Sequence, residues 1–312
     1  MNNFYSDKFF LAPMAGITDL AFRTLCKEYG ADLVVSEMVS SRGLHYKDKK
    51  TKELLMTNET EAPLIVQLFG NEPEVMAEAA RMLEDMGVLY LDINMGCPAP
   101  KIVKNGDGCS LMRDEALAGK VAESVVKAVK IPVSVKFRSG WDADNINAVS
   151  FAKTMENAGV SAVTVHGRTK NQFYSGSADY NVIKNVRKVV KIPVIANGDV
   201  VDAKSAKEIL SKTSCDSLMI GRGSMGNPFI FSEIKADFKG ENRIFDIHDK
   251  KRALLRHIEL MEEYKPEHIG APEMRKHFAW YLKGIPHSNK LKAEAFTVKT
   301  YKEMRNLANK IF

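Results

Sequence analysis

The chain has 312 residues, of which 45% are hydrophobic and 27% charged, and its net charge is +6. This composition excludes a disordered or fibrous protein and suffices for one large globular domain with a small appendage. No apolar run approaches the ~20 residues that span a bilayer. The opening MNNFYSDKFF lacks the basic and apolar regions of a secretory signal. We therefore expect a cytoplasmic protein without a membrane segment. We also expect a monomer, although the sequence does not determine the oligomeric state.

The cysteines are scattered along the chain, at Cys26, Cys97, Cys109 and Cys215. They form no CxxC pair, and no histidine stands at a spacing from them that is typical of a zinc site. We expect reduced thiols, with neither a disulfide framework nor a bound metal.

Short β-rich runs alternate with helix-like segments over the first three quarters of the chain. The eight runs are 10–14, 33–38, 64–69, 90–94, 132–137, 162–166, 193–197 and 217–222. Helical spacing is clearest in the intervening segments 75–86, 114–129, 149–158 and 203–211. Eight such units in an unbroken series predict a (β/α)₈ TIM barrel.

Most of these runs end in a residue that a chemical site could use. In a TIM barrel the C-terminal strand ends meet on one face, where catalysis takes place. That face would gather Pro13, Met14, Glu37, Gln67, Asn94, Lys136, His166, Asn197 and Arg222. The pattern predicts an enzyme.

The alternation stops near residue 240. Apolar residues at helical spacing follow in 247–264, 274–282 and 296–311. We expect a barrel domain in residues 1–240 and a small all-helical domain in residues 241–312.

The helical tail is basic. Residues 244–312 hold 14 Lys and Arg against nine Asp and Glu, so they carry most of the net charge of +6. A basic helical module beside a nearly neutral barrel suggests a polyanionic partner, with nucleic acid as the first candidate. Lysines that only solvate a surface explain the charge equally well.

Two glycine-rich loops follow the last two strands, in 195–199 (IANGD) and 221–228 (GRGSMGNP). Loops at these positions commonly hold a phosphate in TIM barrels, because glycines let backbone N–H groups approach the anion. Arg222 can add a charge-assisted bond. Such loops can also serve only to turn the chain, but two of them at the two favoured strands favour phosphate binding.

A buried Lys136 at the end of strand five requires an anion or a polar ligand. FMN offers both a phosphate and an electron-rich ring edge. The small, sharply bent segment 12–16 (APMAG) would let a flat ring lie against backbone, and Gln67 could contact the ring amide edge. His166 alone fits a structural histidine; its place at a strand end favours contact with a ligand.

The segment DINMGCP (92–98) places Cys97 just beyond strand four, on the same face. A free cysteine is more often buried packing, which is our interpretation of Cys26 and Cys215. Near an electron-rich reduced flavin the Cys97 thiol would stay protonated and act as an acid. Cys109, in GDGCS, is the rival that the sequence does not exclude.

Taken together, these motifs resemble the tRNA-dihydrouridine synthases, most closely the bacterial DusB-type branch. The resemblance covers nearly the whole chain, including RKH (275–277) and WYLKG (280–284) in the helical tail. It implies an FMN-bound barrel, a helical RNA-binding domain, NADPH as reductant and reduction of uridine in tRNA. Cys109 departs from the pattern, since similar sequences often carry Ser or Ala there.

Position by position, the resemblance makes Cys97 the catalytic acid. The implied flavin contacts are Pro13, Met14, Ala15, Gln67, Lys136, Asn197, Gly198, Asp199, Gly221 and Arg222. We add His166 as a cofactor contact, and we expect Asn94, Lys136, Arg168, Arg275 and Lys276 to bind the substrate. Hydride would pass from reduced FMN to C6 of uracil, and Cys97 would protonate C5.

Two alternatives come from other classes. A small-molecule FMN barrel of the dihydroorotate or dihydropyrimidine dehydrogenase kind would not need a basic tail. A flavin- or RNA-binding protein without activity would not need Cys97. The position of the target uridine, the preference for NADPH over NADH and the role of Cys109 are open at this level.

Overall fold

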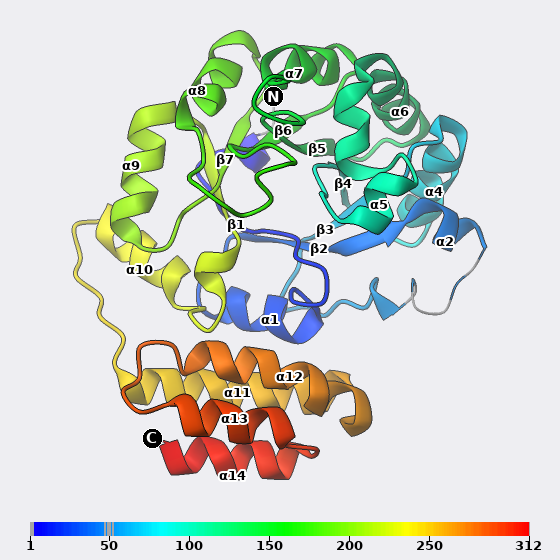
Figure 1. The fold of residues 1–312 in the computed structure, drawn as a ribbon. Coiled ribbons are helices and arrows are strands. Elements are labelled where there is room, and N and C mark those ends of the chain that lie inside the picture. Colours follow the sequence, from blue (N-terminus) through cyan, green and yellow to red (C-terminus); the bar gives the residue numbers. More distant parts are fainter. Residues whose placement is uncertain (1–2, 47, 49–50, 52, 312) are drawn as a thin grey trace.

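In the computed structural model, which describes residues 3–46, 48, 51 and 53–311, eight parallel strands close into a barrel. Each strand pairs with its neighbour in sequence, and β8 pairs with β1 (Figure 1). The strands are β1 (Phe9–Leu11), β2 (Leu33–Ser40), β3 (Leu64–Phe69), β4 (Tyr90–Met95), β5 (Val133–Arg138), β6 (Ala162–His166), β7 (Val194–Asn197) and β8 (Ser217–Ile220). The predicted TIM barrel is confirmed.

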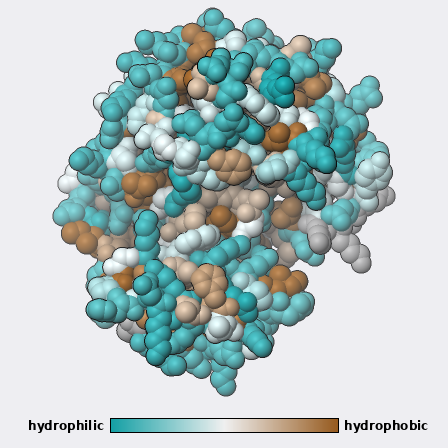
Figure 2. Space-filling model, viewed as in Figure 1, coloured by the Kyte–Doolittle hydropathy of each residue, from teal (hydrophilic) through white to brown (hydrophobic). Residues whose placement is uncertain are grey.

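Helices surround the barrel and connect its strands (Figure 1). They are α1 (Leu20–Glu28), α2 (Ser41–His45), α4 (Pro73–Asp85), α5 (Pro100–Lys104), α6 (Glu115–Ala128), α7 (Ala148–Asn157), α8 (Tyr180–Val189), α9 (Ala203–Thr213) and α10 (Ile230–Phe238). Asp and Ser residues begin several of them; Asp19, for example, accepts a hydrogen bond from the Phe22 amide at 3.0 Å. Their outer faces are largely hydrophilic (Figure 2).

Two strands end earlier than predicted. β1 ends at Leu11, because Pro13 has no N–H for the ladder and the amide of Met14 donates instead to Thr18 Oγ1 at 2.8 Å. β8 ends at Ile220, since the chain turns at once into the 3₁₀ helix Arg222–Ser224. Both ends therefore leave the sheet as loops at the C-terminal face of the barrel.

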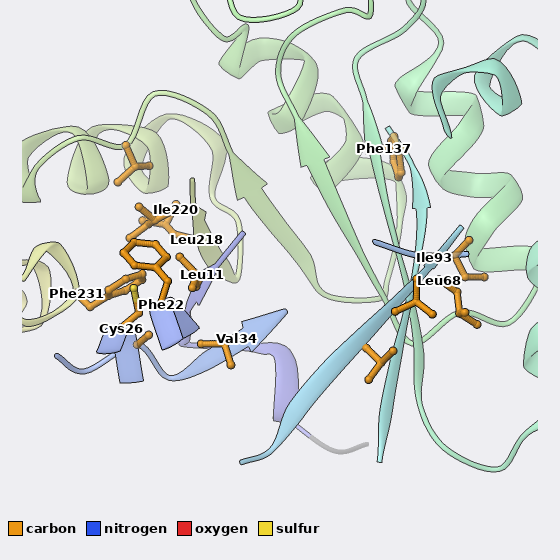
Figure 3. Packing of buried hydrophobic residues seen from close by; sticks show 14 of the residues in the cluster. Leu11, Phe22, Cys26, Val34, Leu68, Ile93, Phe137, Leu218, Ile220 and Phe231 are labelled. Atoms are coloured by element: carbon orange, nitrogen blue, oxygen red, sulfur yellow. The ribbon is translucent and has the colours of Figure 1, made fainter. Parts of the chain in front are cut away.

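The barrel interior changes from apolar to polar along its axis. Its N-terminal half is filled by an apolar cluster that includes Phe10, Val35, Ile65, Ile195 and Met219. On the outside, side chains of α1 and α10 pack against outward-facing residues of β1 and β8, among them Leu11 and Ile220 (Figure 3). This packing holds the strands in register and leaves polar side chains at the C-terminal end.

Four further helices follow the barrel in the described chain: α11 (Ile247–Tyr264), α12 (Glu267–Tyr281), α13 (Asn289–Thr297) and α14 (Tyr301–Ile311). They lie together beside α1, where α11 packs against it (Figure 1). The predicted helix 247–264 has the same bounds as α11. The helix predicted over 274–282 begins earlier, after Pro266, and contains Pro272.

The single helix predicted over 296–311 is wrong. The chain becomes extended at Val298, with ψ 137°, which separates α13 from α14. The new helix is capped reciprocally: the Glu303 carboxylate accepts from the Thr300 amide at 3.3 Å, and Thr300 Oγ1 accepts from the Glu303 amide at 3.1 Å. This T-x-x-E pattern is a capping-box signal that the apolar spacing concealed.

A buried histidine pair lies where the helices meet the barrel. His257 of α11 and His277 of α12 have ring centroids 4.7 Å apart, and both rings lie 5.4 Å from that of Phe22 on α1. Beside them, Lys265 forms a 2.7 Å ion pair with Asp19. The contact between the helices and the barrel is thus aromatic at its centre and ionic at its margin.

Candidate active site

A cavity of about 1260 Å³ opens at the C-terminal ends of the strands. Residues of the C-terminal region close one side of it: Lys250 of α11, Trp280 of α12 and Lys283 in the turn after α12. Of the residues predicted for the site, it is lined by Pro13, Met14, Ala15, Asn94, Cys97, Lys136, His166, Arg168, Asn197, Gly198, Asp199, Gly221 and Arg222. Gln67, Arg275 and Lys276 are not part of its wall.

The strand register explains why these residues converge. Successive residues of a strand point to opposite faces, so side chains two apart share the interior. Asn94 is paired in register with Lys136 across β4 and β5, and His166 with Asn197 across β6 and β7. Each of these side chains therefore stands at the upper level of the barrel interior.

Asn94 holds the cysteine loop. Its Oδ1 accepts hydrogen bonds from the amides of Gly96 at 3.1 Å and Cys97 at 2.9 Å. Its Nδ2 donates to Gln67 Oε1 at 2.8 Å, and Gln67 Nε2 donates to Asp92 Oδ2 at 2.6 Å. Gln67 is fully buried and Asn94 nearly so. Asn94 lines the cavity and keeps a second Nδ2 hydrogen, so it can still donate to a ligand, whereas a ligand contact of Gln67 would need rearrangement of this chain.

The two candidate cysteines differ in access. Cys97 is partly exposed and lines the cavity, whereas Cys109 is fully buried and lies outside its wall. The Cys109 thiol donates to the Gly96 carbonyl at 3.0 Å, and burial raises its pKa to about 12. Burial also raises the pKa of the Cys97 thiol. Cys97 is therefore the protonated thiol that a ligand in the cavity can reach.

Lys136 faces the cavity with its ammonium bound to Asn197 Oδ1 at 3.0 Å. Burial, followed by the charge of Arg138, lowers the pKa of Lys136 to about 8. The amide of Asn197 is fixed from the other side, because its Nδ2 donates to the Met219 carbonyl at 2.8 Å. The lysine thus carries a positive charge that an electronegative ligand edge would stabilise.

His166 is a neutral member of the wall. Burial lowers its pKa strongly, and the nearby cations Lys136, Arg138 and Arg168 lower it further. A neutral imidazole can both donate and accept a hydrogen bond. That His166 contacts a ligand stays a prediction. The position of His166 in the cavity wall supports this prediction.

The loop after β7 brings backbone close to the cavity. Gly198 has φ 130°, a conformation that side chains rarely adopt, and a Cβ there would lie 2.6 Å from that of Ala178. Asp199 follows with φ 55° and accepts a hydrogen bond from the Ala178 amide at 2.7 Å. Only glycine at position 198 permits this approach, which suits a backbone cradle for an anion.

Arg168 is bound to its own loop. Its guanidinium donates to the carbonyls of Ser175 at 3.0 Å and Gly176 at 2.5 Å and forms a 2.7 Å ion pair with Asp199. Burial opposes ionisation of Asp199, but the bond and charge of Arg168 lower its pKa overall. Arg168 therefore orders the rim in the structure, and its predicted substrate contact stays untested.

Aromatic residues at the rim were missed by the sequence reasoning. Phe173 and Tyr174 line the cavity and are 40% and 50% exposed. The Arg222 guanidinium lies 4.9 Å from the centroid of the Tyr174 ring. Two adjacent aromatic residues in the loop that follows Arg168 were the available signal. Arg222 itself is half exposed, so it can reach an anion at this rim.

The two tail residues predicted to bind RNA both contact carbonyl groups. Lys276 Nζ donates to the Gly16 carbonyl in the loop after β1, and Arg275 Nε donates to the Val298 carbonyl at 2.8 Å. An ammonium has three donors and a guanidinium five, so each group can still reach a phosphate. Lys276 also ties the helices to the loop that carries Met14.

Among the described residues, no cluster of three or more His, Cys, Asp or Glu side chains could hold a metal ion. No helix in this part of the chain is both long and apolar enough to cross a membrane.

Sequence comparison identifies the relatives of this chain. The family described as Dihydrouridine synthase (Dus) matches residues 10–312. The chain belongs to this family. It is 49% identical over 286 residues to a "Probable tRNA-dihydrouridine synthase" of Rickettsia bellii, covering 91% of this chain and 88% of that protein.

The branch is the DusB type. The chain is 41% identical to a protein named "tRNA-dihydrouridine synthase B" from Vibrio vulnificus, with 89% of this chain and 87% of that protein covered. The protein of the same name from Pseudomonas aeruginosa is 39% identical, with 92% and 87% covered.

Solved structures resemble this chain in fold. Histamine dehydrogenase from Rhizobium sp. 4-9 superposes with a TM-score of 0.57 at 12% identity, over 81% of this chain and 49% of that one. The 6-hydroxypseudooxynicotine amine oxidase of Pseudomonas geniculata gives 0.58 at 15% identity, over 75% and 47%. The chain thus spans about half the length of these two structures, and the likeness concerns the barrel fold alone.

Proposed function

We propose that this protein reduces uridine in tRNA to 5,6-dihydrouridine, with FMN as cofactor and NADPH as reductant. The observation that carries the proposal is Cys97, a protonated thiol that a buried chain of hydrogen bonds holds at the wall of a large cavity. Family membership supports the reaction, and the names of the relatives support tRNA as the substrate.

The residues of the cavity fit FMN. Gly198 and the glycine-rich loop that begins at Gly221 would donate backbone N–H groups to its phosphate. Arg222 would add a positive charge at the same rim. Lys136, held by Asn197, would face the electron-rich edge of the ring. The small residues Pro13 and Ala15 also line the cavity. Reduced FMN, when bound, supplies the hydride for C6 of uracil.

A residue of the chain itself would supply the proton. Cys97 would donate to C5 of uracil, because burial keeps its thiol protonated near neutral pH. The Asn94 amide fixes the backbone from which that thiol projects. Lys136 would stabilise negative charge at a uracil carbonyl in the transition state. Uracil must leave its stack to enter the cavity, which costs a few kcal/mol.

The helical region would grip the tRNA. Its excess of positive charge suits a phosphate backbone, and it borders the cavity through Lys250, Trp280 and Lys283. We infer that the chain divides near residue 240 into a catalytic barrel and this RNA-binding region, and that it acts as a monomer.

The proposal is tested with the purified protein and with cells that lack its gene. The protein should be yellow, release FMN on denaturation and form dihydrouridine in tRNA with NADPH. Dihydrouridine should vanish from particular tRNA positions in the deletion strain and return with the gene. A colourless protein that takes up no added FMN would exclude the cofactor, and unchanged tRNA in the deletion strain would exclude the substrate.

A further inference from the structure

A second cavity, of about 330 Å³, lies on the same barrel face between α2, the end of β3 and α5. Its wall includes Lys101 of α5 and Ser41 and Arg42 of α2. The wall of the first cavity includes Pro98 and Ala99. Because only Pro100 separates these from Lys101, the two cavities lie on either side of the start of α5.

A carboxylate without a donor forms part of this second cavity. Asp107 is only 4% exposed and belongs to the cavity wall, yet its Oδ1 has no hydrogen-bond partner among the residues that the structure describes. A buried polar group of this kind is costly unless a ligand or water completes it. A small shift of the carboxylate toward the cavity would let it accept from a hydroxyl group.

Two cations stand at the edge of the same cavity. Lys101 is exposed, and Arg42 is about half exposed and forms an ion pair with Glu72 at 2.5 Å. Phosphate is recognised by such groups through charge-assisted hydrogen bonds. A buried acceptor with cations at the edge matches a sugar hydroxyl that is joined to a phosphate.

We propose that this cavity binds the phosphorylated ribose of the RNA nucleotide next to the target uridine, whose 2′-hydroxyl donates to Asp107 while its phosphate contacts Lys101 and Arg42. The inference rests on the proposed function. RNA is favoured as the source because its backbone must continue across this face from the uridine in the first cavity. The contact would distinguish RNA from DNA, since only RNA carries the 2′-hydroxyl.

The phosphate part is tested with Lys101→Met in the FMN-loaded enzyme. Lys104→Met is the matched control, because Lys104 is exposed on the same helix but lies outside the cavity wall. Lys101→Met should lower the slope of log Kd against log salt for tRNA by roughly 0.7–0.9, and Lys104→Met should leave it near the parent value. Equal effects of the two substitutions would overturn the phosphate site.

The ribose part is tested with tRNA that carries 2′-deoxyribose on either side of the mapped uridine. The parent should bind this tRNA about tenfold more weakly than the all-ribose form, as expected for one hydrogen bond to a charged group. Asp107→Ala, which removes the acceptor, should bind both forms alike and keep the parent's thermal midpoint, because Oδ1 has no protein hydrogen bond to lose. A parent enzyme that does not distinguish the two tRNAs would overturn the 2′-hydroxyl contact.

A phosphorylated ribose is also present in NADPH, and flavin reduction by NADPH without tRNA separates the two sources. Under the proposal the KM for NADPH is the same in the parent and in Lys101→Met. A raised KM with unchanged tRNA binding would assign the cavity to the dinucleotide and overturn the RNA assignment. If the parent forms no dihydrouridine in any tRNA, the proposed function itself fails, whatever the cavity binds.

Discussion

Asn94 Oδ1 accepts a hydrogen bond from the backbone amide of Cys97 at 2.9 Å. This bond joins the proposed acid to a chain of buried amides and carboxylate that continues through Gln67 to Asp92. A side chain predicted to bind the substrate thereby sets the position of the cysteine loop. Under the proposed function the thiol must reach one carbon atom of the base, which depends on such positioning.

Asn94→Ala should reduce kcat for uridine reduction by roughly 10- to 100-fold, because the Cys97 loop loses its anchor. The Kd for tRNA should stay within about twofold, since most binding comes from phosphate contacts elsewhere. Asn94→Asp keeps an acceptor for the two loop amides and should recover part of kcat. Single-turnover rates and tRNA binding measured side by side separate these effects. If Asn94→Ala raises Kd and leaves kcat unchanged, Asn94 is a substrate contact instead.

Cys97→Ala should lose uridine reduction by about 10²–10⁴-fold while FMN and tRNA still bind, because only proton delivery is removed. Cys109→Ala is the control: it removes a buried thiol that donates to the Gly96 carbonyl, outside the cavity wall. The measurement is the single-turnover rate with prereduced enzyme. A near-normal rate in Cys97→Ala together with loss in Cys109→Ala would transfer the role of the acid to Cys109.

FMN affinity should fall as the pH rises above about 8. Burial and Arg138 lower the pKa of Lys136 to about 8, so above that pH the empty site holds a neutral lysine. An electronegative ring edge that accepts a hydrogen bond from the ammonium favours the charged form, and binding must then include uptake of a proton. Flavin fluorescence titrations of the apoprotein should show up to tenfold weaker binding per pH unit between pH 8 and about 9.5. Lys136→Met should bind FMN weakly at every pH, without this dependence.

The histidine pair should make the protein less stable in mild acid. Burial lowers the pKa of His257 to about 4, and burial and His257 lower that of His277 well below its usual value. As the pH falls below about 6.5, the imidazoles of the unfolded chain therefore become protonated before those of the folded protein. Stability is complete above pH ~6.5 and declines toward pH ~4, by about 1.4 kcal/mol per pH unit for each imidazole.

Denaturation midpoints across this pH range measure the decline. His257→Phe, which keeps an aromatic ring beside Phe22, should flatten it by the equivalent of one proton. His268→Gln, at an exposed position of α12, should leave the slope unchanged. Parallel curves for the parent and His257→Phe would show that His257 does not titrate in this range.

Neutralising Arg275 and Lys276 together should weaken tRNA binding and lower the salt slope by roughly one unit per lost contact. Lys302→Met, on an exposed position of α14, is the single-charge control. Lys276→Met should also lower the thermal midpoint, because it loses the bond to the Gly16 carbonyl. If the double variant binds tRNA with the parent's affinity and salt slope, Arg275 and Lys276 have a structural role and do not contact tRNA phosphates.

Local patterns in the sequence determined the architecture. Short β-rich runs separated by helical spacing predict the barrel, because the period of apolar residues sets which face of each element is buried. The same period of two placed Asn94, Lys136, His166 and Asn197 at the upper end of the interior. The position of a residue along its strand decides whether its side chain enters the barrel interior. The register of the parallel strands brings these side chains to the same level.

Only the tertiary structure decided what each of these side chains contacts. Cys97 reaches the cavity and Cys109 does not, although both follow β4 in glycine-bearing loops. Gln67 and Asn94 bond to one another across β3 and β4, and Arg168 bonds to the carbonyls of its own loop. Hydrogen-bond partners and burial depend on groups that are distant in sequence and on loop paths that follow no periodicity. For this reason the sequence could place these residues on one face of the barrel, while their partners and access to the cavity required the fold.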